Sequence, residues 1–228
     1  MHDDAPRLLV VAHGTASVAG SATTAALIDA VRAARPSIAV DLCFLDVARP
    51  RLADVLDDRP TVVVPLLLST GYHVQTDIPA AVAPHPAVRV ARHLGPDDRL
   101  VDALADRLGP VPAAARLVLV GAGSSRVEAR VELDETARRL GARFGRDVPA
   151  FTLGEDLTRR FADLAPVSVA TYLLAEGQFV DTLRSAVDGR GTVAPPLGVH
   201  PALVELVWHR YDEALSPGPV DSVGFAAP

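Results

Sequence analysis

The sequence predicts an α/β protein made of two consecutive units, each built on a parallel β-sheet. Three observations support this fold class. Short, continuous apolar runs such as residues 62–68 are typical of strands buried on both faces of a sheet. Amphipathic helical patterns alternate with these runs, as parallel strands require. The second half of the chain repeats the pattern of the first half, which indicates an internal duplication.

The first unit is expected to alternate strands and helices. Apolar runs predict the strands, and stripes of leucine and valine at helical spacing predict the helices. The expected order is a strand at Arg7–Ala12, a helix between the hydroxyls of 20–24 and Pro36, a strand at 38–45, a helix from Arg49-Pro50, a strand at 62–68, a short helix at 77–82, a strand at 88–91 and a helix at 97–108.

A connector at 109–115 leads into the second unit. Sliding the chain by 109 positions places residues 118–124 on 9–15, and removing three residues from this shift places 173–177 on 67–71. The chain is therefore expected to divide into units 1–110 and 116–217, followed by a tail at 218–228. The second unit is expected to close with an amphipathic helix through Leu203, Leu206, Val207 and Tyr211.

Composition excludes several classes of function. Every one of the 22 basic side chains is arginine, so a lysine Schiff base and a Walker lysine are absent. The net charge is −6 with both signs interspersed, so no basic face for nucleic acid is expected. Apolar runs are too short to span a membrane and no leader pattern opens the chain, which favours a cytoplasmic protein. The single Cys43 is expected to be a small buried hydrophobe.

Three polar side chains follow the ends of predicted strands. His13, Asp46 and His73 are expected at one edge of the first sheet, where open α/β proteins bind their ligands. Two imidazoles and a carboxylate suit Fe, Co, Ni or Zn while leaving coordination positions open. Neighbouring residues expected to contact a substrate are Gly14, Thr15, Ser69, Thr70, Gly71 and Tyr72.

The duplication provides an internal comparison. One such histidine alone is more often a polar loop residue than a ligand. In the duplicate, however, His13 becomes Ala122 and His73 becomes Phe179, whereas Asp46 becomes Glu155. Packing requirements are shared by both copies, so the loss of both imidazoles from one copy favours a chemical role for His13 and His73.

The motifs around these residues resemble those of a known family. AHGT around His13, CFLDVARPRLADVL around Asp46 and VVVPLLLSTGYHVQTDIP around His73 are similar to the sirohydrochlorin chelatases of the CbiX and SirB type, the class II chelatases. The second half, with YLLAEGQFVDTL and APPLGVHPALVELVWHRY, resembles the degenerate C-terminal half of the long members.

The resemblance implies two flavodoxin-like lobes facing each other across a cleft. It implies insertion of Fe²⁺ for sirohaem or Co²⁺ for cobalamin into sirohydrochlorin, with Ni²⁺ or Zn²⁺ as substitutes in vitro and no other cofactor. His13 and His73 take the places of the metal ligands, and Asp46 that of an acidic residue that is more often Glu. Glu155 and Gln178 are the polar candidates on the opposing lobe. A monomer or a homodimer is expected.

Two other readings of the residues stay open. A carrier of metal or tetrapyrrole would use the same three side chains without turnover. A phosphoryl-transfer enzyme with His13 as nucleophile is a third reading, since histidine phosphatases also carry His-Gly after a first strand. Those enzymes have an arginine before the histidine, where this chain has Ala12.

Overall fold

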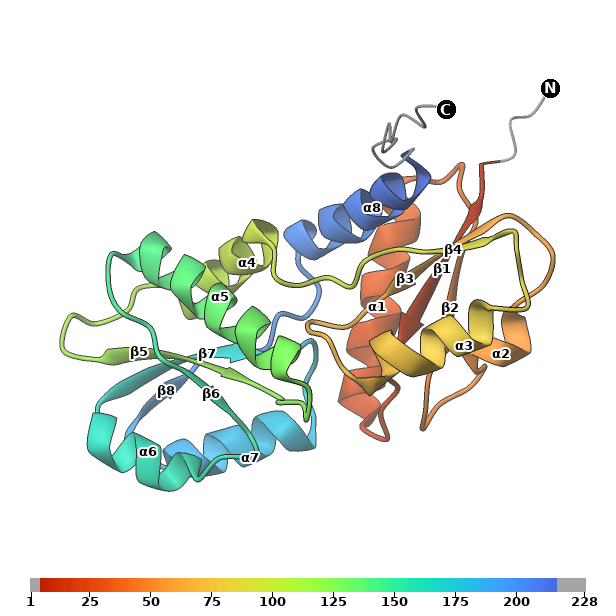
Figure 1. The fold of residues 1–228 in the computed structure, drawn as a ribbon. Helices are drawn as coiled ribbons and strands as arrows, with labels where there is room; N and C mark the ends of the chain where they lie inside the picture. The colour runs from red at the N-terminus through yellow and green to blue at the C-terminus, as the bar shows by residue number, and fades with distance from the viewer. Residues whose placement is uncertain (1–4, 217–228) are drawn as a thin grey trace, which may run out of the picture.

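The computed structural model describes residues 5–216 and confirms the predicted class. Two four-stranded parallel sheets follow each other along the chain, in the strand orders β2-β1-β3-β4 and β6-β5-β7-β8. Helices cover both faces of each sheet (Figure 1). Within residues 5–216 no helix combines the length and the apolar character needed to cross a membrane. The predicted tail at 218–228 lies outside the described residues.

The first lobe contains the elements that the sequence predicted, in the predicted order. β1 has its predicted bounds, whereas the other three strands end before their apolar runs do, and flanking side chains such as Leu66 are still packed in the core. The elements are β1 (Arg7–Ala12), α1 (Val18–Ala34), β2 (Val40–Phe44), α2 (Leu52–Val55), β3 (Thr61–Pro65), a π-helical turn (His73–Asp77), α3 (Ile78–Val82), β4 (Val88–Val90) and α4 (Asp98–Leu108).

The second lobe repeats this order after the connector. Its elements are β5 (Arg116–Gly121), α5 (Val127–Phe144), β6 (Ala150–Thr152), α6 (Leu157–Leu164), β7 (Val167–Tyr172), α7 (Gln178–Val187), β8 (Gly191–Val193) and α8 (Pro201–Leu215). The terminal helix α8 buries Leu203, Leu206, Val207 and Tyr211, as its pattern predicted.

Successive residues of β1 point to opposite faces of the first sheet. Leu8 and Val10 belong to a large inner cluster, whereas Leu9 and Val11 belong to an outer cluster with Cys43. All of them are buried, which explains why the sequence of this strand is apolar without alternation. Burial also raises the pKa of the Cys43 thiol to about 12, so this residue is an unreactive part of the core.

Two helices cross between the lobes. Helix α4 precedes the connector but packs on α5 and β7 of the second lobe, and α8 ends the second lobe but packs on α1 and β3 of the first. The inner cluster therefore runs continuously from Leu8 in β1 to Leu119 in β5. The predicted boundaries follow the order of the sequence, whereas the packing of α4 and α8 crosses them. The reason is that α8, from the second half of the chain, covers the inner face of the first sheet, and α4, from the first half, covers the inner face of the second sheet.

The ladders define which residues correspond in the two lobes. Arg7 pairs with Thr61 and Arg116 pairs with Val167, so the same offsets place Ala122 at the His13 position and Phe179 at the His73 position. In the second strands, Val10 pairs with Leu42 and Leu119 with Ala150. This offset is one residue smaller than predicted. Asp46 therefore corresponds to Gly154, and the expected match to Glu155 was wrong by one position.

Candidate functional site

The structure brings His13 and His73 together. The two ring centroids lie 4.9 Å apart, in an edge-to-face arrangement with an interplanar angle of 77°. His13 follows β1 directly and is exposed, and His73 follows β3 and is partly buried. Neighbouring parallel strands end at the same edge of a sheet, which is why residues 60 positions apart in the sequence meet here.

His73 lies in a helix, although the sequence predicted a loop at this position. The chain becomes helical at Tyr72 and forms a π-helical turn over His73–Asp77 before α3 begins. The amide of Gln75 donates to the carbonyl of Gly71 at 3.1 Å and closes the first turn. Such π-helical turns are frequent at functional sites.

Asp77 fixes the orientation of the His73 ring. Its Oδ2 lies 2.6 Å from Nδ1 of His73, across the widened turn. A carboxylate accepts, so Nδ1 carries the hydrogen and the lone pair of Nε2 is free. His13 has the same arrangement, because its Nδ1 lies 3.2 Å from the carbonyl oxygen of Gly14, which accepts only. Both rings therefore have Nε2 available to bind an ion or a proton.

Asp46 lies on the neighbouring loop after β2 and is exposed. A hydrogen bond from the Val47 amide, assisted by Arg51, His13 and His73, holds the pKa of Asp46 below its ordinary value. The carboxylate is thus within the electrostatic range of both imidazoles. Val47 has a φ of 59°, a conformation that β-branched residues rarely adopt, so the loop carrying Asp46 is strained.

Within residues 5–216, no set of three or more His, Cys, Asp or Glu side chains is arranged to hold a metal ion. The two imidazoles form a pair, and Asp46 lies near this pair without completing a three-ligand cage. The ligand set His13, Asp46 and His73 therefore stays a prediction. An exposed pair of nitrogen ligands leaves most of the coordination sphere of an ion open.

Gly14 holds the two loops together. It adopts a φ of +96°, and a Cβ at this position would lie 2.2 Å from the carbonyl oxygen of Asp46. The amide of Asp46 donates to the carbonyl of His13 at 2.9 Å. The hydroxyl of Thr15, expected to contact substrate, accepts from the Ser17 amide at 3.1 Å and so helps to start α1. Gly14 is therefore required for the close contact of the His13 and Asp46 loops.

The strand ends of the second lobe face those of the first. A Cβ at Gly71 would lie 3.9 Å from Oγ of Ser124, which follows β5. A Cβ at Gly177, which follows β7, would lie 3.4 Å from Cβ of Ser17. Gln178 is exposed at the start of α7, beside this contact. Loops of both lobes thus meet near the segments that carry His13 and His73. The cleft expected between the lobes stays a prediction.

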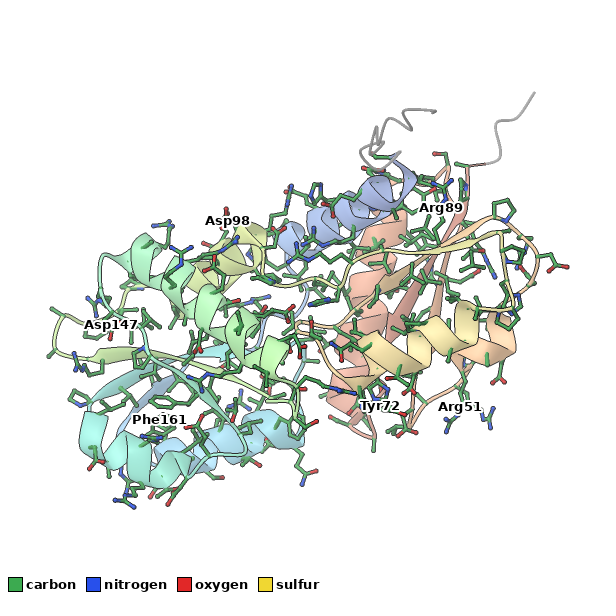
Figure 2. The ribbon with its side chains drawn as sticks, viewed as in Figure 1. Arg51, Tyr72, Arg89, Asp98, Asp147 and Phe161 are labelled. Carbon is green, nitrogen blue, oxygen red and sulfur yellow. The ribbon has the colours of Figure 1, made fainter. Side chains whose placement is uncertain are left out.

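Tyr72 and Ser69 remain accessible, whereas Thr70 does not. Figure 2 shows Tyr72 and Arg51 along the edge of the first lobe at which its strands end, and Tyr72 is 56 % exposed. Thr70 is 8 % exposed, and both its amide and its hydroxyl donate to Glu132. The expectation that Thr70 contacts substrate is therefore not supported, because its polar groups are used inside the protein.

Sequence reasoning missed Asp77 and Glu132. The spacing of four residues between His73 and Asp77 contained a usable signal, since residues so spaced are neighbours on a helix. The signal is hidden when residues 69–76 are expected to form a loop, because the spacing has a meaning only on a helix. Glu132 lies 62 residues from Thr70, and no local pattern in the sequence connects them.

Comparison with known proteins agrees with this geometry. Residues 7–111 match the family model described as CbiX. The sirohydrochlorin ferrochelatase of Priestia megaterium is 26 % identical over 92 % of this chain and 90 % of its own length. The structure of CbiX described as the terminal enzyme of sirohaem biosynthesis in denitrifying bacteria is 26 % identical, with a TM-score of 0.67 over 92 % of this chain and all of that chain.

Bacillus subtilis SirB with Fe³⁺ has the same fold. It superposes with a TM-score of 0.77 at 22 % identity, over 92 % of this chain and 95 % of SirB. SirB of the subspecies spizizenii, in complex with cobalt, gives a TM-score of 0.78 at 21 % identity, over 93 % and 96 % of the two chains. Together with the paired histidines at the strand ends, these similarities relate the chain to the CbiX/SirB family of sirohydrochlorin chelatases, with the family model covering residues 7–111.

Proposed function

We propose that this protein is a sirohydrochlorin chelatase that inserts Fe²⁺ or Co²⁺ into the tetrapyrrole macrocycle. The observation that carries the proposal is the pair of imidazoles at the strand ends of the first lobe, 4.9 Å apart. An ion about 2 Å from a nitrogen of each ring is compatible with this spacing. Metal and macrocycle are both substrates in this reaction.

The histidines would serve the reaction in two ways. Their free Nε2 atoms present the ion while most of its coordination sphere stays open to the macrocycle. Insertion replaces two pyrrole hydrogens by the ion, and neutral imidazole is the side chain best suited to accept protons near neutral pH. Asp46, with its lowered pKa, supplies negative charge beside the incoming cation. Asp77 holds one ring in the required orientation.

Exposed apolar side chains near the strand ends, with the Tyr72 ring 6.4 Å from the His73 ring, support a flat, largely apolar substrate. Most of the large hydrophobic residues that the fold leaves exposed lie in the loops and first helical turns after strands, in both lobes. Such clustering marks binding surfaces, and aromatic rings stack on flat conjugated systems. These residues are Val18, Val47 and Tyr72 in the first lobe and Val127, Val131 and Phe179 in the second.

The test is to mix purified protein with sirohydrochlorin and Co²⁺ or Fe²⁺ and to follow the visible spectrum of the macrocycle. We expect catalysed insertion by the wild-type protein, and His13→Ala and His73→Ala variants that stay folded but lose most of the activity. His209→Ala is a matched control, because this histidine lies on α8 and pairs with Glu213. Full activity in the double variant of His13 and His73 would remove the proposed mechanism. Binding of both substrates without turnover would favour a carrier.

A further inference from the structure

A half-buried carboxylate connects the second lobe to the segment that precedes His73. Glu132 lies in α5 of the second lobe and contacts Thr70 of the first. Its Oε2 accepts from the Thr70 amide at 2.6 Å, and its Oε1 accepts from the Thr70 hydroxyl at 2.8 Å. Nε2 of His93 lies 3.1 Å from Oε1, close enough for charge interaction but outside hydrogen-bond geometry. The Glu132 side chain is only 18 % exposed.

The surroundings of Glu132 stabilise its charged form. Burial alone would raise the pKa of this carboxyl, but contact with His93 and the two hydrogen bonds from Thr70 outweigh burial and hold the pKa below its ordinary value. Hydrogen bonds to an ionised group are shorter and stronger than neutral ones. A buried carboxylate without such partners would be costly, so the contacts of Glu132 with Thr70 are held firmly.

A second contact from the same lobe fixes the preceding residues. The hydroxyl of Tyr172, at the end of β7, donates to the carbonyl of Leu68 at 3.1 Å. This hydroxyl and that carbonyl are packed so closely against Gly95 that a Cβ there would lie 2.2 Å and 2.3 Å from them. Residues 68–70 are thus held from the second lobe just before the chain turns into the helix of His73.

We propose that Glu132 is a positioning residue for His73. By holding both donors of Thr70, three residues before His73, it sets the start of the π-helical turn and hence the distance between the two imidazoles. The consequence for insertion rests on the proposed function, whereas the consequence for ion binding does not. The second lobe, which has Ala122 and Phe179 in place of the histidines, would then contribute to catalysis by orienting the lobe that kept them.

The experiment compares Glu132→Ala, Glu132→Gln and Thr70→Val with the control Glu135→Gln. Glu135 lies on the same helix and pairs with Arg138 and Arg139 of that helix. Each variant is titrated with Co²⁺ alone, followed by its absorption spectrum, and assayed for kcat and KM with sirohydrochlorin. Circular dichroism melting reports whether each variant is folded.

We expect Glu132→Ala to weaken Co²⁺ binding and to lower kcat by about tenfold, the lower end of the range for residues that orient metal ligands. The KM for sirohydrochlorin should change by less than about twofold, because the exposed apolar surface is unchanged. Thr70→Val keeps the amide donor, so its Co²⁺ affinity and kcat should fall less than those of Glu132→Ala. Glu132→Gln should also fall less than Glu132→Ala in both quantities. Glu135→Gln should match the wild type.

Each outcome decides the proposal. Folded Glu132→Ala with wild-type Co²⁺ affinity and kcat would overturn it, and so would a variant that melts earlier but binds Co²⁺ normally, since that result marks a purely structural contact. If Glu132→Ala does not fold, the Co²⁺ affinity and kcat of Thr70→Val are compared instead, and wild-type values of both would overturn the proposal. If the wild-type protein binds Co²⁺ but does not insert it, the proposed function fails, and the Co²⁺ affinities still test the role of Glu132.

Discussion

Replacing Asp77 with alanine removes the only side-chain hydrogen bond that the structure, over residues 5–216, gives to the His73 ring. The ring then loses a 2.6 Å charge-assisted hydrogen bond and can rotate or exchange its tautomer. Both side chains are partly exposed, His73 at 29 % and Asp77 at 40 %, so solvent screens part of this interaction. The loss of metal affinity should therefore lie at the lower end of the range of about 10- to 100-fold that is found when a hydrogen-bond partner of a metal ligand is removed.

We expect Asp77→Ala to bind Co²⁺ about tenfold more weakly, a difference of about 1.4 kcal/mol. Asp77→Asn should fall between this variant and the wild type, because the amide oxygen still accepts from Nδ1 without the negative charge. The assay is a Co²⁺ titration followed by absorption, with melting curves to show that the variants are folded. Insertion rates measured in parallel should fall by a similar factor.

Asp102→Asn is the matched control, since this carboxylate lies exposed on α4, away from the histidines. If Asp77→Ala bound Co²⁺ as tightly as the wild type, the claim that the carboxylate orients His73 would be refuted. Equal losses in Asp77→Ala and Asp102→Asn would point to a general effect of charge. A loss specific to Asp77 supports the assignment of Nε2 as the binding atom.

Two further predictions concern stability. Gly14→Ala should lower the free energy of unfolding by about 2 kcal/mol or more, because its Cβ would meet the Asp46 carbonyl at 2.2 Å. Gly145→Ala, at a φ of +64° with open space around the added Cβ, should lower the free energy of unfolding by less. Equal losses of unfolding free energy in the two variants, measured by urea unfolding, would contradict this explanation. Glu132→Gln should be less stable than the wild type above about pH 5, because the folded protein lowers the pKa of Glu132 from its ordinary 4.5. The lowered pKa stabilises the fold above the unfolded value, and this contribution is lost as pH falls through the folded one. Urea unfolding at pH 6 and pH 3.5 should therefore show a shrinking difference, and a constant one would be inconsistent with an ionised Glu132.

Much of the first lobe could be predicted because its signals are local. The apolar runs predict the strands, and the rule that parallel strands end at one edge predicts that His13 lies beside His73, as the structure shows. The duplication was readable for the same reason, since each ladder repeats the same spacing of buried residues. The error of one position at Asp46 arose in a short strand and its loop, where few buried residues define the register.

The start of the His73 helix could not be read from periodicity, because its first turn carries the site and shows no apolar stripe. The hydrogen bond from Gln75 to Gly71 and the widened turn that admits Asp77 become visible only in three dimensions. A strand-end histidine followed four residues later by an aspartate is nevertheless a pattern that a reader of the sequence can use.

The amino-acid sequence by itself determined the fold class, the repeat and the pair of histidines, because each of these depends on spacing along a single segment or on one rule about strand ends. Only the tertiary structure decided that α4 packs on the second lobe and α8 on the first, that Thr70 is buried against Glu132 and that Asp46 corresponds to Gly154. These features depend on contacts between residues far apart in the chain. Their energy comes from packing two lobes against each other, which no local pattern encodes.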